Sequence, residues 1–200
     1  MNNGIIKEAN GIYRLKIPFE ETYTSVFVLE IENGVLLVDC ATTDFDVDNY
    51  IVPFLLELGK SIELVTYLVL SHEHIDHAGG LKRLLQLNGL IKVIDSVEKL
   101  PSGLEIYKMA GHLNSCIGVF DAKTKILISC DGLQGAGVSK YKCSIGDKQG
   151  YIDTIERIKK DKRIEKILFS HPYEPWCKNF VEGKEEIDKC LSDCLKYIGE

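Results

Sequence analysis

The stretch that decides the fold runs from Leu64 to Gly80 and reads LVTYLVLSHEHIDHAGG. Its first part, Leu64–Leu70, is a short apolar run that predicts a buried strand. Three histidines and one aspartate then fall within six residues, in the pattern His72-x-His74-x-Asp76-His77. Imidazole nitrogens and carboxylate oxygens are ligands for zinc, iron and other transition metals. We therefore expect a metal site at the end of this strand.

The spacing within this motif indicates how its members share ions. His72 and His74 are two residues apart, so in an extended strand end their side chains point the same way and both reach one ion. Asp76 and His77 lie past the turn and can reach a second ion. A solvated, histidine-rich loop is the alternative interpretation. Strand-end loops are, however, where ligands converge with access to solvent.

The two remaining histidines lie where a site would be built. His112 stands directly before a second apolar hairpin, and His171 follows the apolar run Ile167–Phe169. Either one alone is more typical of a structural or exposed histidine. Asp39 and Asp131 also come at or just past the ends of expected strands. These four positions are candidate site residues only in combination with the His72–His77 motif.

Apolar periodicity predicts the other elements. Strands are expected at Ile12–Ile17, Thr24–Ile31, Val35–Val38, Leu64–Leu70, Ile91–Ile94, Ile117–Phe120, Ile126–Ile128 and Ile167–Phe169. Helices are expected at Phe45–Gly59, Leu81–Leu87, Gln149–Lys160 and Glu182–Tyr197. Asn33-Gly34 between two apolar runs predicts a hairpin in which both turn residues have positive φ.

This order of elements predicts an α/β protein. We expect two similar halves, about 1–100 and 101–200, each a sheet covered by helices, packed sheet to sheet. A chain of 200 residues without a low-complexity linker indicates one domain over residues 1–200.

Charge and composition exclude several classes of protein. The net charge of −6 argues against a nucleic-acid partner, which needs clustered cations. No apolar run reaches the roughly 18 residues of a membrane span, and the first residues lack a secretory pattern. The seven cysteines are an odd number, which favours free thiols in a reducing cytoplasm.

Taken in order, these residues resemble the pattern of the metallo-β-lactamase superfamily along nearly the whole chain. The matching positions are Asp39, then His72-x-His74-x-Asp76-His77, then Gly111-His112, then Asp131, and finally His171. The resemblance implies a four-layer αβ/βα sandwich of two mixed β-sheets packed face to face, with helices outside. It implies two divalent metal ions, with zinc expected and iron or manganese as alternatives.

The resemblance also implies a role for each matching residue. His72, His74 and His112 would hold the first ion; Asp76, His77 and His171 would hold the second; Asp131 would bridge the two. Asp39 would accept a hydrogen bond from a ligand histidine and fix its ring. Asp76 is the expected catalytic residue, because it can orient the attacking hydroxide or carry a proton to the leaving group.

The chain departs from the family pattern in three places. The family often has Gly-His-Thr-x-Gly where this chain has Gly111-His112-Leu113-Asn114-Ser115. Cys130 and Ser170 stand where the family usually has glycine before the bridging aspartate and the last histidine. The larger side chain can shift Asp131 or crowd its position, and a Cys130 thiolate is an alternative ligand that would change the metal preference. The segments Gly132–Ile145 and Pro172–Trp176 flank ligands and are expected to shape the substrate pocket.

The expected activity is hydrolysis of an ester, thioester, lactone or amide bond in a small-molecule substrate. Two cations about 3.5–4 Å apart can share a hydroxide, so the enzyme needs no serine or cysteine nucleophile. Only 29 residues follow His171 and 40 separate it from Asp131. These lengths resemble the small glyoxalase-like and lactonase-like members and leave no space for the extra domains of larger branches.

Other classes of function remain open at this point. A relative with the same histidines and one iron would oxidise persulfides, and metal analysis separates it from a hydrolase. A non-catalytic metal-binding relative has no chemical need for all seven ligands. RNA processing is disfavoured by the acidic charge. The oligomeric state does not follow from the sequence.

Overall fold

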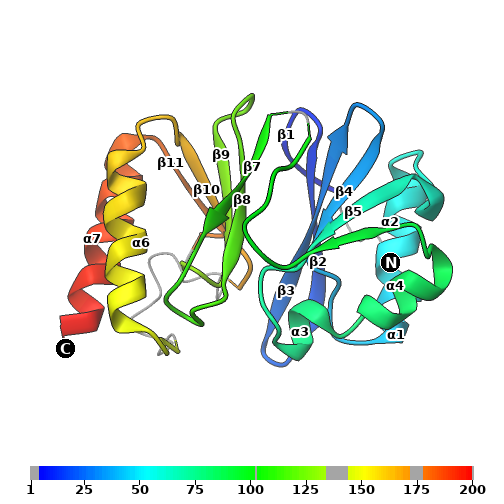
Figure 1. The fold of residues 1–200 in the computed structure, drawn as a ribbon, viewed down its shortest axis with the longest axis horizontal. Helices are drawn as coiled ribbons and strands as arrows, with labels where there is room; N and C mark the ends of the chain where they lie inside the picture. Colours follow the sequence, from blue (N-terminus) through cyan, green and yellow to red (C-terminus); the bar gives the residue numbers. More distant parts are fainter. Residues whose placement is uncertain (1–4, 102, 134–143, 172–177, 200) are drawn as a thin grey trace. The chain divides into compact units, whose positions relative to one another are not determined.

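The structure is a computed structural model that describes residues 5–101, 103–133, 144–171 and 178–199. The chain forms two compact units, Met1–Asp95 and Ser96–Glu200. Each unit contains one mixed β-sheet with helices, as Figure 1 shows. The expected α/β class with two mixed sheets is therefore confirmed. That the two units act as a single domain stays a prediction.

The first unit is built on a six-stranded sheet in the order β1-β2-β3-β4-β5-β6. Its strands are β1 (Ile6–Ala9), β2 (Ile12–Phe19), β3 (Thr22–Ile31), β4 (Gly34–Val38), β5 (Val65–Val69) and β6 (Lys92–Ile94). Neighbours from β1 to β4 are antiparallel, whereas β4, β5 and β6 run parallel. The predicted strands of this half are confirmed, and β1 is an additional one.

The hairpin between β3 and β4 forms as predicted, but its turn is one residue earlier. Ile31 pairs with Gly34, so the turn residues are Glu32 and Asn33. Gly34 has φ +142 and begins β4, and Asn33 is not among the residues with positive φ. The prediction that Asn33 and Gly34 both have positive φ was therefore wrong. The two-residue loop was correctly predicted in length and misplaced in register.

The predicted helix over Phe45–Gly59 is present in three consecutive pieces. They are α1 (Asp44–Asp46), a π-helical turn (Val47–Ile51) and α2 (Val52–Glu57). Pro53 lies in the first turn of α2, where its missing N–H costs little. A 3-10 turn (Ile62–Leu64), α3 (Ile75–Ala78) and α4 (Leu81–Leu87) complete the unit.

Thr43 caps the start of α1 and is the basis of a stability prediction. Its Oγ1 accepts from the N–H of Asp46 at 3.1 Å, and Asp46 Oδ2 accepts from the N–H of Thr43 at 2.9 Å. Thr43→Ala removes one side of this capping box, so we expect the free energy of unfolding to fall by about 1 kcal/mol. Thr43→Ser keeps the hydroxyl and should retain most of this contribution to the free energy of unfolding. Chemical denaturation measures both, and equal losses would contradict the assignment.

The second unit is built on a five-stranded sheet in the order β11-β10-β9-β8-β7. Its elements are β7 (Leu104–Lys108), β8 (Ile117–Asp121), β9 (Ile126–Cys130), α6 (Lys148–Lys160), β10 (Lys166–Phe169), β11 (Phe180–Glu182) and α7 (Lys184–Gly199). All pairs are antiparallel except β9 with β10. The predicted elements are present, and β7 and β11 are additional strands.

Helices cover one face of each sheet with a continuous apolar core. In the first unit the cluster joins helical Val47, Ile51, Phe54, Leu55 and Leu84 to alternate strand residues such as Leu15, Ile17, Val26, Val28 and Leu37. In the second unit it joins Tyr151, Ile155, Ile158 and Leu191 of α6 and α7 to Tyr107, Phe120, Leu127 and Ile167. Burying each aliphatic side chain contributes about 1.5–3 kcal/mol, which holds the strand ends firmly.

A parallel strand pair in each unit positions candidate ligands. Asp39 follows β4, and His72 follows the parallel neighbour β5. Asp131 follows β9, and His171 follows its parallel neighbour β10 by two residues. Because carboxyl ends of parallel strands meet at one sheet edge, each pair delivers an acid beside a histidine. Among the described helices, none is long and apolar enough to cross a membrane.

Candidate metal centre

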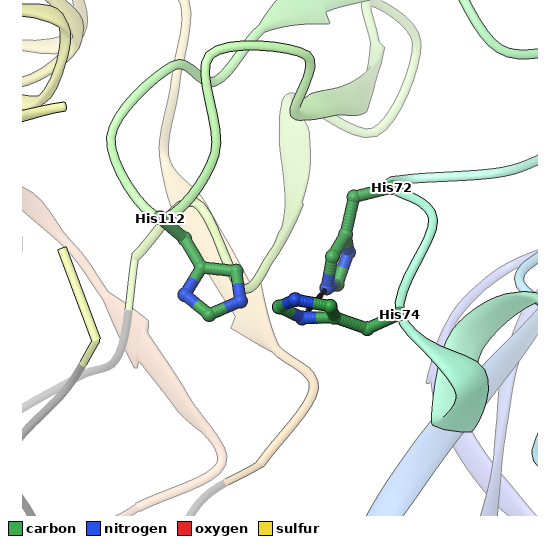
Figure 2. Close-up of side chains that lie close together, drawn as sticks. All are labelled: His72, His74 and His112. Carbon is green, nitrogen blue, oxygen red and sulfur yellow. Dashed lines mark hydrogen bonds between the residues drawn. The ribbon is translucent and has the colours of Figure 1, made fainter. Parts of the chain in front are cut away.

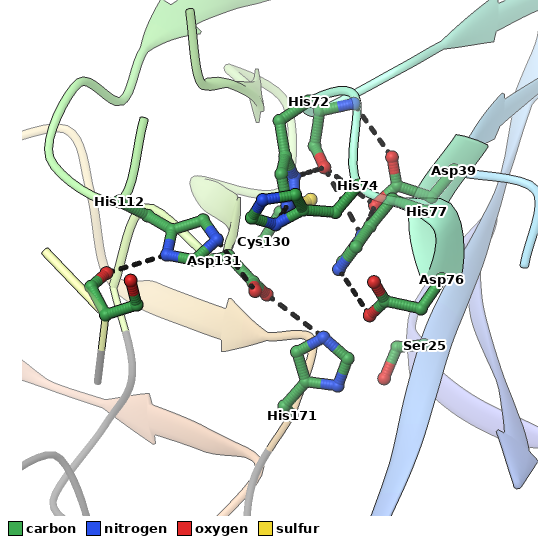
Figure 3. Close-up of polar contacts among 12 residues, drawn as sticks. Ser25, Asp39, His72, His74, Asp76, His77, His112, Cys130, Asp131 and His171 are labelled. Carbon is green, nitrogen blue, oxygen red and sulfur yellow. Dashed lines mark hydrogen bonds and ion pairs between the residues drawn. The ribbon is translucent and has the colours of Figure 1, made fainter. Parts of the chain in front are cut away.

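Asp39 is the centre of a buried hydrogen-bond network at the end of β4. Its Oδ1 accepts from the backbone N–H of Ser71 at 2.8 Å, and its Oδ2 accepts from the Ser71 hydroxyl at 2.9 Å. The same Oδ2 lies 2.7 Å from Nδ1 of His77 (Figure 3). Asp39 is fully buried and has φ +64, a left-handed conformation that aspartate tolerates better than most residues. The expected contact of Asp39 with a candidate ligand histidine is present.

His72 and His74 converge, as their spacing predicts. Nε2 of His72 lies 3.0 Å from Nδ1 of His74, and the ring centroids are 4.7 Å apart (Figure 2). A tetrahedral zinc ion with Zn–N bonds of about 2.0–2.1 Å holds its ligand nitrogens roughly 3.4 Å apart. His72 is buried, whereas His74 is exposed at the N-cap position of α3. The pair fits neighbouring ligands of one ion.

Asp76 and His77 form a second pair in the four-residue helix α3. Oδ2 of Asp76 lies 3.1 Å from Nε2 of His77 (Figure 3). Asp39 occupies the other side of the His77 ring, so the nitrogen that faces Asp76 is Nε2. The backbone ties this helix to the Asp39 segment, because the N–H of Cys40 donates to the carbonyl of His77 at 2.8 Å.

The Cys40 thiol lies beside this contact without being a candidate ligand. Its Sγ donates to the His77 carbonyl at 3.2 Å. Burial, and secondly the Asp39 carboxylate, raise the pKa of Cys40 far above its usual range. A protonated, buried thiol is a poor metal ligand and a poor nucleophile, so Cys40 serves packing.

In the second unit Asp131 lies between two histidines. Its Oδ2 is 3.9 Å from Nε2 of His112, and its Oδ1 is 3.3 Å from Nε2 of His171. Figure 3 shows the Asp131 carboxylate with the His171 contact drawn. Each carboxylate oxygen therefore faces a different imidazole nitrogen. This is the arrangement that a bridging carboxylate needs.

The His112 ring is oriented by the backbone of its own unit. Its Nδ1 lies 2.7 Å from the carbonyl oxygen of Ser144, which can only accept, so Nδ1 carries the proton and Nε2 is left to bind. Gly111, which precedes His112, lets the backbone lie close to the Tyr151 ring because it has no side chain. It has φ +153, and a Cβ at this position would lie 2.3 Å from the Tyr151 ring.

The chain is similar in sequence and in fold to known proteins. The sequence model of the metallo-beta-lactamase superfamily matches residues 20–103, which include Asp39 and the whole His72–His77 motif. The fold agrees over nearly the entire chain with solved metallo-β-lactamases. This chain has the metallo-β-lactamase fold. The resemblance that the sequence predicted is thereby confirmed, and no curated protein sequence matches the chain.

Three solved structures illustrate the likeness. FIM-1 from Pseudomonas aeruginosa, in its mono-zinc form, has a TM-score of 0.75 at 17% identity, covering 98% of this chain and 96% of its own. The enzyme from Pontibacter korlensis has a TM-score of 0.76 at 14% identity, covering 98% and 99%. That from Erythrobacter litoralis, with β-mercaptoethanol in its active site, has a TM-score of 0.72 at 17% identity, covering 96% of each.

Cys130, one of the departures from the superfamily pattern, keeps the backbone of a glycine. Its φ is +47, in the left-handed region, and its side chain is buried. The pairing of β9 with β10 skips Ser129, so a bulge precedes Cys130 and turns the chain toward Asp131. A side chain in this conformation costs about 1–2 kcal/mol relative to glycine. That the Cys130 side chain shifts or crowds Asp131 stays a prediction. The source of strain is the positive φ of Cys130.

Cys130 therefore offers a backbone test. We expect the free energy of unfolding of Cys130→Gly to be about 1 kcal/mol higher than that of Cys130→Ala. Both variants lose the sulfur, but only glycine relieves the strain of the positive φ. Thermal or denaturant unfolding of the two variants measures the difference. An alanine variant as stable as the glycine variant would refute the strain at this residue.

Two contacts at the candidate site were missed by sequence reasoning. The Ser71 hydroxyl lies 3.0 Å from Nδ1 of His72, and the Ser144 carbonyl orients His112. A small hydroxyl residue directly before the first histidine was a usable signal for Ser71, whereas a backbone carbonyl leaves none. Of the segments expected to shape the substrate pocket, residues 134–143 and 172–176 lie outside the described residues.

Proposed function

We propose that this protein is a metal-dependent hydrolase that cleaves an ester, thioester, lactone or amide bond in a small molecule. His72, His74 and His112 hold one divalent ion, Asp76, His77 and His171 hold a second, and Asp131 bridges them. Zinc is the proposed metal. The observation that carries the proposal is the grouping of donors inside each unit. His72 pairs with His74 and Asp76 with His77 in the first unit, and Asp131 lies between His112 and His171 in the second.

The chemistry of the donor set fits this proposal. Five imidazoles and two carboxylates suit zinc, iron and manganese, and each metal would keep positions open for substrate. Asp131 supports a bridging role because its two oxygens face different histidines. The mono-zinc form of FIM-1 also supports zinc as the metal of this fold.

The residues of the chain do three things in this mechanism. Asp39 and the Ser144 carbonyl hold the protons of His77 and His112 on Nδ1, so that each Nε2 stays available. Asp131 places its two oxygens toward different ligand groups. Asp76 accepts a proton from the attacking water or passes it to the leaving group. Divalent ions bound there would lower the pKa of a water molecule and polarise the oxygen of the bond that is cleaved.

The proposed partners and compartment follow from charge and thiols. A net charge of −6 supports a small-molecule substrate in preference to a nucleic acid. In the part of the chain that the structure describes, none of five cysteines is in a disulfide: Cys40, Cys116, Cys130, Cys190 and Cys194. Reduced thiols support a cytoplasmic enzyme.

Metal-dependent turnover of simple substrates tests the proposal. Purified protein is stripped with a chelator, divided, and reloaded with zinc, manganese or ferrous iron. Each sample is assayed on an ester, a thioester, a lactone and a β-lactam. We expect at least one bond class to be hydrolysed only by reloaded protein. Full activity in stripped protein would refute the proposal, and one iron per chain with dioxygen uptake would favour the persulfide-oxidising alternative.

A further inference from the structure

Ser71 lies between Asp39 and two candidate ligands that the proposed function assigns to different ions. Its hydroxyl oxygen is 2.9 Å from Asp39 Oδ2, 3.0 Å from Nδ1 of His72 and 3.4 Å from Nδ1 of His77. All four side chains are buried, with Ser71 at 1% and Asp39 at 0% relative exposure. In such a setting each proton has a defined place, because an unpaired polar group costs about 1–3 kcal/mol.

The placement of protons in this network is fixed by the atoms available. A serine hydroxyl has one proton, and the Asp39 carboxylate can only accept, so the Ser71 hydroxyl donates to Asp39. The Ser71 oxygen then accepts from Nδ1–H of His72. His77 donates its own Nδ1–H to Asp39 directly, at 2.7 Å. Nδ1 of both rings therefore carries a proton. Nε2 of His72 faces Nδ1 of His74 at 3.0 Å, and Nε2 of His77 faces Oδ2 of Asp76 at 3.1 Å.

We propose that Ser71 is a positioning residue through which the single carboxylate of Asp39 orients ligands of both metal ions. Asp39 acts on His77 directly and on His72 through the Ser71 hydroxyl. The inference rests on the proposed function for the assignment of His72 and His77 to separate ions. It predicts an asymmetry: loss of Ser71 weakens the ion held by His72, whereas loss of the Asp39 carboxylate weakens both.

The tautomers are tested without any metal. Nitrogen-15 shifts of the histidine rings are recorded by NMR at alkaline pH for wild type, Ser71→Ala, Ser71→Thr and Asp39→Asn. We expect Nδ1–H rings for His72 and His77 in wild type. Ser71→Ala should move His72 toward the Nε2–H tautomer and leave His77 unchanged, and Ser71→Thr should restore His72. An unchanged His72 ring in Ser71→Ala would overturn the inference, as would equal changes in both rings.

Metal titration tests the asymmetry. Stripped protein is titrated with zinc, and cadmium-113 NMR identifies each ion by its own resonance. We expect Ser71→Ala to weaken one ion by about 10–100-fold and to leave the other within about threefold. Asp39→Asn should weaken both. Equal weakening of both ions by Ser71→Ala would contradict the proposal. A wild type that binds no metal would refute the proposed function, while the ring tautomers would still decide the role of Ser71.

Discussion

Replacing His74 with alanine is expected to remove one of the two proposed ions and to lower hydrolytic activity by about 100- to 1000-fold. His74 is the best single test because it is the exposed member of the His72–His74 pair. Its truncation leaves the buried network around Asp39 intact, so the protein should unfold at nearly the wild-type temperature. Elemental analysis and an assay on the substrate found for the wild type measure the two effects together.

A matched control separates metal loss from general damage. Lys82 lies a short distance along the chain in α4 and is exposed. Lys82→Ala should keep the wild-type metal content and activity, because a surface truncation in a helix changes little beyond its own contacts. A His74→Ala variant with wild-type metal content and wild-type turnover would show that the His72–His74 pair binds no catalytic ion.

Gly79→Ala is expected to lower the free energy of unfolding by about 3 kcal/mol and to weaken metal binding. A Cβ on Gly79 would lie 1.9 Å from the carbonyl oxygen of Thr42 and 2.5 Å from that of Ile75. Both atoms belong to the backbone, so the clash is relieved only by moving α3 or the Asp39–Thr42 segment. These are the segments that the hydrogen bond from Cys40 to His77 holds together. Denaturant unfolding and zinc titration measure the result.

Gly89→Ala is the control for this substitution. A Cβ there meets only the Leu85 carbonyl oxygen, at 3.6 Å, and the residue is free of positive φ. We expect a change within about 0.5 kcal/mol. Equal stability of the Gly79→Ala and Gly89→Ala proteins would mean that α3 does not need to approach the Asp39 segment so closely.

Much of the fold was predictable because apolar periodicity is a local signal. The predicted helix Leu81–Leu87 coincides with α4, and the predicted pairs His72–His74 and Asp76–His77 are each found together. The additional strands β1, β7 and β11, which were missed, all lie at sheet edges. With a partner on only one side and partly exposed residues, they lack the apolar run that marks a central strand.

The misplaced details have local physical causes. The Asn33-Gly34 signal indicates a hairpin but does not decide which residue begins the next strand, and pairing with Ile31 recruits Gly34 into β4. The left-handed backbone of Cys130 could not be predicted, because such positions are recognised in a sequence by the glycine that usually occupies them. The helix α3 was missed because four residues are too few for a helical period.

The central claim is that ligands from residues 72–77 and from residues 112–171 bind the same pair of ions. An anomalous-difference map of zinc-loaded crystals tests it most directly. The account predicts two zinc peaks per chain, one on His72, His74 and His112, the other on Asp76, His77 and His171, with Asp131 on both. Zinc bound by His72 and His74 while His112, Asp131 and His171 contact neither ion would contradict it.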